Sequence, residues 1–257
     1  MEFLKWSTAD HIATITIAKA PANALSSKVL KELSLILDEV EQDENVRVIL
    51  IHGEGRFFSA GADIKEFTTI ENGEQFSELA RLGQNLFERM EGFAKPIIAA
   101  VHGAALGGGL ELAMACHFRL VSENAKLGLP ELQLGLIPGF AGSQRLPRLV
   151  GTAFAAQMLL TSTPITGVEA VRAGLANHAY PEVELLENAN KIARQIAKKS
   201  PVAVKAILEL FSYTKPEKFH AGVEREAVLF GKVFESLDGQ EGITAFIDKR
   251  EPNFIGK

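Results

Sequence analysis

The segment KPIIAAVHGAALGGGLELA, residues 95–113, contains a strand pattern, a glycine cluster and the start of a helix, in that order. Ile97–Val101 is a short apolar run that predicts a buried strand. The three glycines of Gly107–Gly109 lose much backbone entropy on folding, so they mark strained dihedrals or close contact with a ligand. Leu110–Ala113 then favours a helix. A strand that leads through glycine into a helix is typical of an α/β protein.

The same alternation continues on both sides of this segment. Residues 13–17 alternate apolar and threonine side chains, and residues 46–51 and 118–121 are mainly apolar, so all three predict strands. Residues 26–40 and 76–90 repeat apolar side chains at helical spacing and predict helices. We therefore expect an α/β core of largely parallel strands covered by helices.

From about residue 151 the strand patterns almost disappear and helix signals replace them. Thr166–Glu169 has the form of a capping box, and Ser200-Pro201 has the favoured order for a helix start. The sequence thus predicts an α/β core over residues 1–195 and a C-terminal helical region over residues 196–257. No low-complexity linker separates them, so we expect the helical region to pack on the core or on a neighbouring subunit.

Composition and charge narrow the class of protein. The chain has 257 residues, 47% hydrophobic and 23% charged, as in ordinary soluble proteins. A net charge of −5 argues against binding through nucleic-acid phosphates. The single cysteine, Cys116, excludes an intrachain disulfide and is expected to be a small core residue. No signal peptide and no run of ~20 apolar residues is visible, so we expect a cytoplasmic protein without a membrane partner.

Three segments that follow strand patterns contain the candidate functional residues, because α/β proteins usually build their sites there. The first is RFFSAGADIKE, residues 56–66. Its small residues let the backbone approach a ligand closely and leave N–H groups free to donate. The same pattern is typical of a tight turn into a helix capped by Asp63. Taken alone, the segment favours the turn.

The glycine cluster is the second segment. It matches neither the P-loop nor the Gly-x-Gly-x-x-Gly pattern, so an oxyanion hole for a thioester enolate fits better than a phosphate site. Glu111 lies within one turn of this helix start, between Leu110 and Leu112. Local sequence favours a solvated glutamate that stabilises the helix dipole over a catalytic carboxylate.

The third segment is LGLPELQLGLIPG, residues 127–139. Glu131 is a lone carboxylate among apolar residues here. Burial would disfavour its charged form and keep it protonated, ready to donate a proton. The alternative is an exposed glutamate at a helix start after Pro130. This segment does not decide between the two on its own.

Metal and nucleophile chemistry find little support. The histidines show no metal-ligand spacing, so we expect no metal site. Ser59 and Ser143 lack the Gly-x-Ser-x-Gly context of a nucleophilic serine. His102, beside the glycine cluster, is expected to be structural. The six histidines are at positions 11, 52, 102, 117, 178 and 220.

Taken together and in this order, these segments resemble the crotonase superfamily, the enoyl-CoA hydratases and isomerases. The likeness extends over essentially the whole chain, and several motifs in register make it specific. The segments that show it are FSAGADIKE (58–66), KPIIAAVHG (95–103), LGGGLELA (106–113), GLPE (128–131), GLIPG (135–139), QRL (144–146) and EGITAF (241–246), with Lys249-Arg250.

The resemblance implies a spiral of ββα units followed by a helical C-terminal region, assembled as trimers that pair into hexamers. It also implies a coenzyme A thioester whose carbonyl oxygen accepts hydrogen bonds from the backbone N–H groups of Ala62 and Gly108. CoA is part of the substrate, and no separate cofactor is expected. The residues implied along the substrate and CoA track are Ala60, Ala62, Asp63, Ile64, Lys65, Leu106, Gly107, Gly108, Pro130, Pro138, Gly139, Phe140, Phe246 and Lys249.

Reaction type within the superfamily follows the carboxylates. Hydratases have glutamates at the positions that match Glu111 and Glu131, whereas many isomerases keep one acid or place it elsewhere. By this analogy Glu111 is the ionised base that deprotonates water, and Glu131 is the acid that protonates the α carbon. The resemblance therefore implies an enoyl-CoA hydratase of fatty-acid β-oxidation, which adds water reversibly to (2E)-enoyl-CoA and gives 3-hydroxyacyl-CoA.

Three residues depart from the commonest family pattern. His117 stands where many relatives have an acid, while Phe140 and Ser143 replace smaller or different residues. Because Phe140 and Ser143 differ, the resemblance does not define the shape of the acyl pocket. A specialised member of the family, either an enoyl-CoA isomerase or a hydratase for branched or aromatic acyl-CoA, therefore stays an alternative. RNA binding, associated with some members, is disfavoured by the acidic charge. A non-catalytic scaffold is disfavoured by the two glutamates.

Overall fold

A six-stranded sheet forms the centre of the computed structural model, which describes residues 1–67, 72–214, 218, 225–226, 228, 230 and 232–257. The strand order is β1-β2-β3-β4-β6-β9. β1 and β2 are antiparallel and all other neighbours are parallel, so the ends of β2, β3, β4 and β6 meet at one edge. The strands span Leu4–Ala9 (β1), Ile12–Ile17 (β2), Val48–Gly53 (β3), Ile97–Val101 (β4), Phe118–Ser122 (β6) and His178–Tyr180 (β9).

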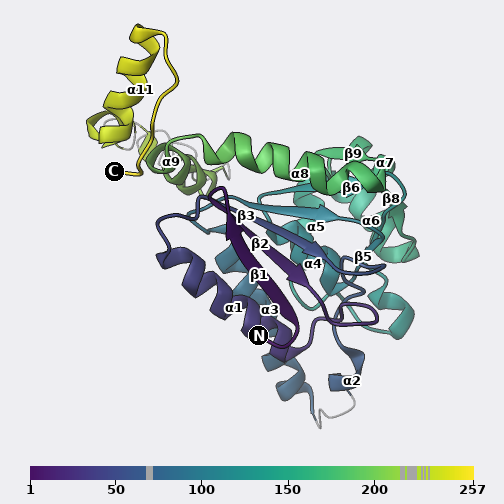
Figure 1. Cartoon of the computed structure of the whole chain (residues 1–257). Helices are drawn as coiled ribbons and strands as arrows, with labels where there is room; N and C mark the ends of the chain where they lie inside the picture. The colour runs from purple at the N-terminus through teal and green to yellow at the C-terminus, as the bar shows by residue number, and fades with distance from the viewer. Residues whose placement is uncertain (68–71, 215–217, 219–224, 227, 229, 231) are drawn as a thin grey trace.

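Helices cover both faces of this sheet (Figure 1). Ile97, Ala99 and Val101 of β4 pack in the core beneath α1 (Ser27–Gln42), α3 (Gly73–Glu91) and α4 (Gly108–Ala115). The intervening Ile98 and Ala100 pack against α8 (Glu182–Ala197) on the other face. Because successive strand residues point to opposite faces, a strand covered on both sides must be apolar throughout. This explains the continuous apolar run of β4.

A smaller sheet lies beside the edge where the parallel strands end. It consists of β5 (Ala104–Leu106), β7 (Lys126–Gly128) and β8 (Ile165–Thr166). Single bridges join Ser59 to Ala105 and Leu25 to Ala62. The loop after β3 is therefore tied to the loop after β4, which places the first two candidate segments against each other.

Local signals in the sequence fix several helix starts. Ser26 caps α1 by accepting a hydrogen bond from the Val29 N–H. Thr166 and Glu169 form a complete capping box at α7 (Gly167–Arg172). Ser200 caps α9 (Pro201–Phe211), which has proline in its first turn. These three predicted starts are confirmed.

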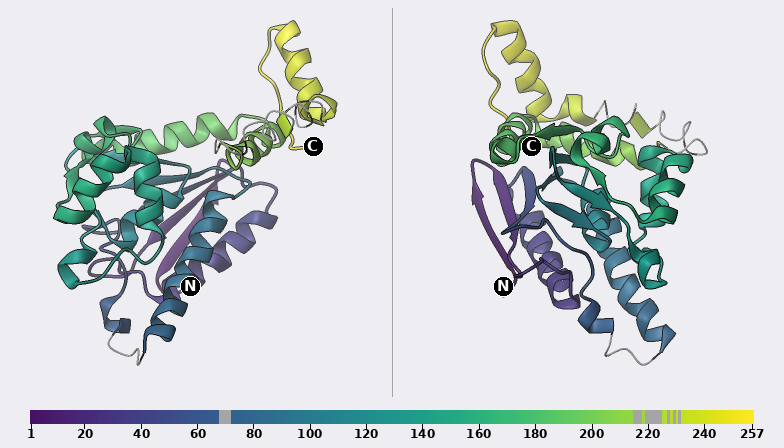
Figure 2. Two further views of the ribbon diagram at one scale, coloured as in Figure 1. Left: turned by 180° about the vertical axis from the view of Figure 1, so that it is seen from behind. Right: turned by 90° about the vertical axis from the view of Figure 1, so that its right-hand side faces the viewer.

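The C-terminal region leaves the main body through α9, and α11 (Leu237–Asp248) projects beyond it (Figure 2). The tail that follows α11 returns to the core, where Arg47 donates hydrogen bonds to the carbonyl oxygens of Ala197 and Phe254. The predicted α/β class and helical C-terminal region are confirmed. The division at residues 195 and 196 stays a prediction, and that position lies inside α8. The remaining elements are α2 (Ile64–Phe67), the 3-10 helix η1 (Glu131–Leu134), α5 (Gly142–Val150) and α6 (Thr152–Thr161).

Candidate active site

A cavity of about 240 Å³ lies between the loop after β3, the start of α4, the side of α3 and the segment 130–140. Its lining is mainly apolar, and two carboxylates face into it. The predicted site residues that line it are Ala60, Ala62, Ile64, Gly107, Gly108, Glu111, Pro130, Glu131, Gly139 and Phe140. Segments far apart in the sequence thus meet at one place.

Two residues that line this cavity have backbone amides without an acceptor among the described residues. Gly108 is the first residue of α4, and its N–H lies in the turn where helical N–H groups have no intrahelical acceptor. The Ala62 N–H is also unpaired in the described chain. A methyl group added at Gly108 would lie 3.2 Å from the Ala62 nitrogen, so the two amides are neighbours. Together they form a pair of donors suited to one oxygen atom.

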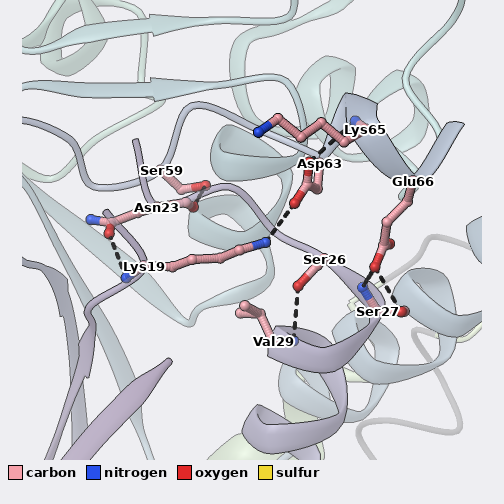
Figure 3. A network of polar contacts seen from close by, with 9 residues as sticks. All are labelled: Lys19, Asn23, Ser26, Ser27, Val29, Ser59, Asp63, Lys65 and Glu66. Carbon is pink, nitrogen blue, oxygen red and sulfur yellow. Dashed lines mark hydrogen bonds and ion pairs between the residues drawn. The ribbon is translucent and has the colours of Figure 1, made fainter. Parts of the chain in front are cut away.

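The loop that presents Ala62 is anchored to the segment after β2 by an ion pair (Figure 3). Lys19 Nζ lies 2.6 Å from Asp63 Oδ2, and the side chains are only 16% and 19% exposed. The hydrogen bond from Lys19 is the main reason why the pKa of Asp63 is lowered. Asp63 also accepts a hydrogen bond from the Lys65 N–H, so it caps α2 as the turn pattern predicted.

Backbone pairing strengthens this anchor. The Leu25 N–H donates to the Gly61 carbonyl, and the Asp63 N–H donates to the Leu25 carbonyl, which brackets Ala62 on both sides. Ser59 Oγ donates to the Asn23 carbonyl at 2.8 Å. The Ala62 amide is therefore held in place by its neighbours rather than by a bond of its own.

Glu111 is buried, with 1% of its surface exposed. Its Oε1 accepts hydrogen bonds from the Phe140 N–H at 2.8 Å and the Gly142 N–H at 2.7 Å. The pKa of Glu111 is raised from about 4.5 to about 7, mainly by burial and in part by the charge of Glu131, although the two amides and Arg145 oppose the rise. The expectation of a solvated glutamate from local sequence is therefore wrong, because the segment 140–142 folds over this side chain.

Glu131 begins η1 directly after Pro130 and is half-buried. Its Oε2 is buried and has no hydrogen-bond partner among the described residues, and burial raises the pKa of this carboxyl. Gly107, with φ of 50°, lies so close that an added methyl group would be 2.9 Å from Glu131 Oε1. A side chain at this position would meet both backbone strain and the carboxylate.

The aromatic ring of Phe140 forms one wall of the cavity. It packs edge-on against Phe87, with ring centroids 5.5 Å apart. Methyl groups added at Gly83 and Gly108 would both lie within about 3.1 Å of the ring, so it is enclosed between α3 and α4. The shape of the cavity between α3 and α4 therefore depends on Phe140.

These observations can be compared with known proteins. The family model described as enoyl-CoA hydratase/isomerase matches residues 7–257. The chain belongs to this family. A probable enoyl-CoA hydratase of Bacillus subtilis is 54% identical over the full length of both chains. A short-chain-enoyl-CoA hydratase of Clostridium acetobutylicum is 42% identical over 93% of this chain and 92% of its own.

Solved structures of the enoyl-CoA hydratase/isomerase family have the same architecture. The crystal structure of an enoyl-CoA hydratase from Bacillus anthracis superposes with a TM-score of 0.93 and 37% identity, and the match covers 99% of this chain and 100% of that one. The predicted crotonase-like fold is confirmed, and the chain is an enzyme of the hydro-lyase type.

Some residues expected along the family's CoA track do not line the cavity. Asp63, Lys65, Leu106 and Pro138 are chain neighbours of lining residues. Figure 1 places α11 at the opposite end of the molecule from α2, and Lys249, which follows α11, is exposed. The side chain of Phe246 lies outside the described part of the chain. The roles of these residues in CoA binding stay predictions.

Sequence reasoning missed the contribution of α3, of η1 and of the residues that follow η1. The apolar spacing of α3 predicted core residues, and the same spacing also places side chains on the cavity wall. A periodic pattern cannot distinguish a buried face from a cavity wall. The missed lining residues are Phe76, Leu79, Ala80, Gln133, Leu134, Leu136 and Ile137.

The other candidates of the sequence are structural. Cys116 is fully buried, and burial raises the pKa of its thiol to about 12, so it is an inert core residue. His117 accepts a hydrogen bond from the Ile97 N–H, and burial lowers its pKa to about 4. His102 Nε2 lies 2.9 Å from the Gly55 carbonyl oxygen. The described residues contain no group of three or more His, Cys, Asp or Glu that could hold a metal ion.

Proposed function

We propose that this protein is an enoyl-CoA hydratase, which adds water reversibly to (2E)-enoyl-CoA and gives 3-hydroxyacyl-CoA. One observation supports this most: two carboxylates with raised pKa and two unpaired amides face the same cavity. Acid–base addition to a conjugated thioester needs these parts together, namely a base, an acid and donors for the oxygen that becomes negative.

The amides of Ala62 and Gly108 are the proposed oxyanion hole. When water adds to the β carbon, electrons move onto the thioester oxygen and form an enolate. Donors already fixed around that oxygen stabilise the transition state, and removal of one such donor typically costs about 3 kcal/mol. The position of Gly108 at the N-terminus of α4 adds the positive end of the helix dipole.

Glu111 is the proposed base. The amides of Phe140 and Gly142 hold Oε1, and Oε2 has no partner among the described residues, which leaves it for the attacking water. As the water oxygen bonds to the β carbon, its proton passes to Glu111. Near neutral pH a pKa of about 7 keeps a large fraction of Glu111 ionised and ready for this step.

Glu131 is the proposed acid. Burial raises its pKa, so it can hold a proton and deliver it to the α carbon of the enolate. One proton is taken from water by Glu111 and one is given by Glu131, so the net change is addition of water. The roles reverse in dehydration. No further cofactor enters these steps, because CoA is part of the substrate.

The reaction matches the hydration step of fatty-acid β-oxidation, which we propose as its setting, in the cytoplasm. The relative from Clostridium acetobutylicum is named a short-chain-enoyl-CoA hydratase, and the cavity wall formed by Phe140 supports a short acyl chain here as well. Within the described residues, no helix is long and apolar enough to cross a membrane.

We further propose that the chain works as a homo-oligomer, a trimer or a hexamer. Large apolar side chains of the C-terminal helices are exposed in the single chain, including Phe211 (57%), Leu237 (60%) and Ile247 (71%). Large apolar side chains left exposed in this way are typical of subunit interfaces.

Spectrophotometry of crotonyl-CoA tests the proposed function. Loss of the enoyl-thioester absorbance is followed for the wild type, Glu111→Gln and Glu131→Gln. We expect turnover by the wild type and a decrease of about 10²- to 10⁴-fold in kcat for each variant, because each lacks one proton-transfer group. A folded wild type that converts 3-enoyl-CoA but does not hydrate crotonyl-CoA would replace the hydratase by an isomerase.

A further inference from the structure

Two side chains donate hydrogen bonds to the turn 139–142, whose amides bind Glu111. Arg145, in α5, is 3% exposed, and its Nη1 donates to the Phe140 carbonyl. Gln84, in α3, donates from Nε2 to the Gly139 carbonyl at 2.8 Å. Neither side chain has a part in the proton transfers described above.

These contacts act on the same peptide groups that bind Glu111. The peptide between Gly139 and Phe140 accepts from Gln84 through its C=O and donates to Glu111 through its N–H. The next carbonyl, that of Phe140, accepts from Arg145. The second donor to Glu111, Gly142, follows two residues later, after Ala141 in the left-handed region with φ of 69°. A rotation of this turn would therefore withdraw both donors from Glu111.

Arg145 also brings a positive charge to an apolar site. The charged groups that act on Glu111 are Glu131, which disfavours its ionised form, and Arg145, which favours it. The guanidinium of Arg145 pairs on its far side with Glu91 Oε2 at 3.0 Å and lies over the Phe87 ring. The Glu91 side chain is 37% exposed, so water screens its negative charge. Glu91 therefore offsets only part of the positive charge of the buried Arg145.

We propose that Arg145 is a positioning residue for Glu111: it fixes the turn 139–142 so that both amides donate to the carboxylate, and its charge favours the ionised form of that carboxylate. This rests on the proposed function, in which Glu111 is the base. Gln84 assists by fixing the first of the two peptides.

The pH dependence of kcat/KM for crotonyl-CoA tests this proposal. The acidic limb of this profile is the range in which kcat/KM rises as Glu111 loses its proton. In Arg145→Met we expect this limb to move to higher pH by about one unit, because the ionised form of Glu111 loses a favourable positive charge. Activity then falls about ten-fold more near pH 6 than near pH 9. In Glu91→Gln the limb moves to lower pH, because Arg145 keeps its charge and loses its counter-ion. If Arg145 had a purely structural role, the acidic limbs of Arg145→Met and Glu91→Gln would not move in opposite directions.

Matched variants make the test decisive. Arg89→Met removes an arginine of α3 that pairs with Asp38 and Glu41 and lies over Phe93, and it should leave the limb unchanged. Arg145→Lys keeps the charge without the forked donor, so we expect the limb near its wild-type position with a lower kcat. If Arg145→Met does not fold, Glu91→Gln still decides, because a limb that stays in place in this variant would overturn the role of the Arg145 charge. An equal loss of activity at every pH in Arg145→Met would overturn the proposal.

Infrared titration separates this inference from the proposed function. The carboxyl band that is absent in Glu111→Gln reports the protonation of Glu111 without any turnover. We expect Arg145→Met to keep this band to higher pH than the wild type. If the wild type does not hydrate crotonyl-CoA and the band still shifts, the proposed reaction fails and the inference stands. If the band does not shift, the inference fails whatever the activity.

Discussion

At the scale of single residues, the burial of Glu111 links activity to stability. The pKa of this carboxyl is about 7 in the folded protein, against about 4.5 for an ordinary glutamate, mainly because of burial. The folded state thus binds a proton more tightly than the unfolded state. This stabilisation is fully present below about pH 4.5 and is lost as the pH rises through about 7, so an ionised Glu111 costs on the order of 3 kcal/mol.

Glu111→Gln should therefore stabilise the protein at high pH although it removes the base. The amide oxygen of glutamine can still accept from Phe140 and Gly142, and it has no charge to bury. We expect Tm to rise by a few degrees near pH 8 and to change little near pH 5, as measured by calorimetry at both pH values. An equal decrease of Tm at pH 8 and at pH 5 would contradict the view that the buried charge of Glu111 destabilises the folded protein.

Phe140 forms one wall of the cavity, and we expect it to limit the length of the acyl chain that fits there. Phe140→Ala opens the wall between α3 and α4, so we expect the ratio of kcat/KM for longer over shorter enoyl-CoA to increase. The lost packing on Phe87 should lower the free energy of unfolding by about 3 kcal/mol. Phe87→Leu is the control, because Phe87 contacts Phe140 but does not line the cavity. A similar change of chain-length preference in both variants would contradict this role.

At the scale of elements, the site depends on how loops are fixed to strands. The ion pair between Lys19 and Asp63 fixes the loop that presents Ala62. We expect Lys19→Met to lower kcat about ten-fold through a misplaced donor and to speed hydrogen exchange at residues 60–63. Lys5→Met is a matched control, since the pair of Lys5 with Glu54 is also 2.6 Å long but exposed. Equal effects of the two variants would show that the anchor is unimportant.

Elements with strong local signals could be predicted from the sequence. The alternation in β2, the apolar run of β4 and the cap residues Ser26, Thr166 and Ser200 all appear where expected. The strands β8 and β9 were missed because two or three residues are too few for a periodic pattern. Their pairing is decided by tertiary contacts.

The site could be predicted only in part for the same reason. Family resemblance pointed to Glu111, Glu131, Ala62 and Gly108, and the structure brings all four to one cavity. Local sequence gave no sign that Glu111 is buried, because the turn that covers it lies 29 residues away in the chain. The cavity wall on α3 likewise has the apolar spacing of an ordinary core face.

At the scale of the whole molecule, the C-terminal region exposes apolar side chains beyond the compact core. We expect light scattering to give a mass that is three or six times 27.9 kDa. Ile247→Asp should reduce this mass, because a charge would have to be buried in the interface. Val183→Asp is the control, since Val183 is 92% exposed and lies in the first turn of α8, outside the C-terminal helices α9 and α11. A monomeric wild type would contradict the proposed assembly.

Incorporation of solvent oxygen tests the central claim most directly. Crotonyl-CoA is incubated with the wild type in water enriched in heavy oxygen, and the product is analysed by mass spectrometry. The account predicts a 3-hydroxyacyl-CoA that contains one solvent oxygen, formed by the wild type and formed about 10²- to 10⁴-fold more slowly by Glu111→Gln and Glu131→Gln. A product without solvent oxygen, or unchanged formation of the hydroxy product in either variant, would contradict hydration by this pair of glutamates.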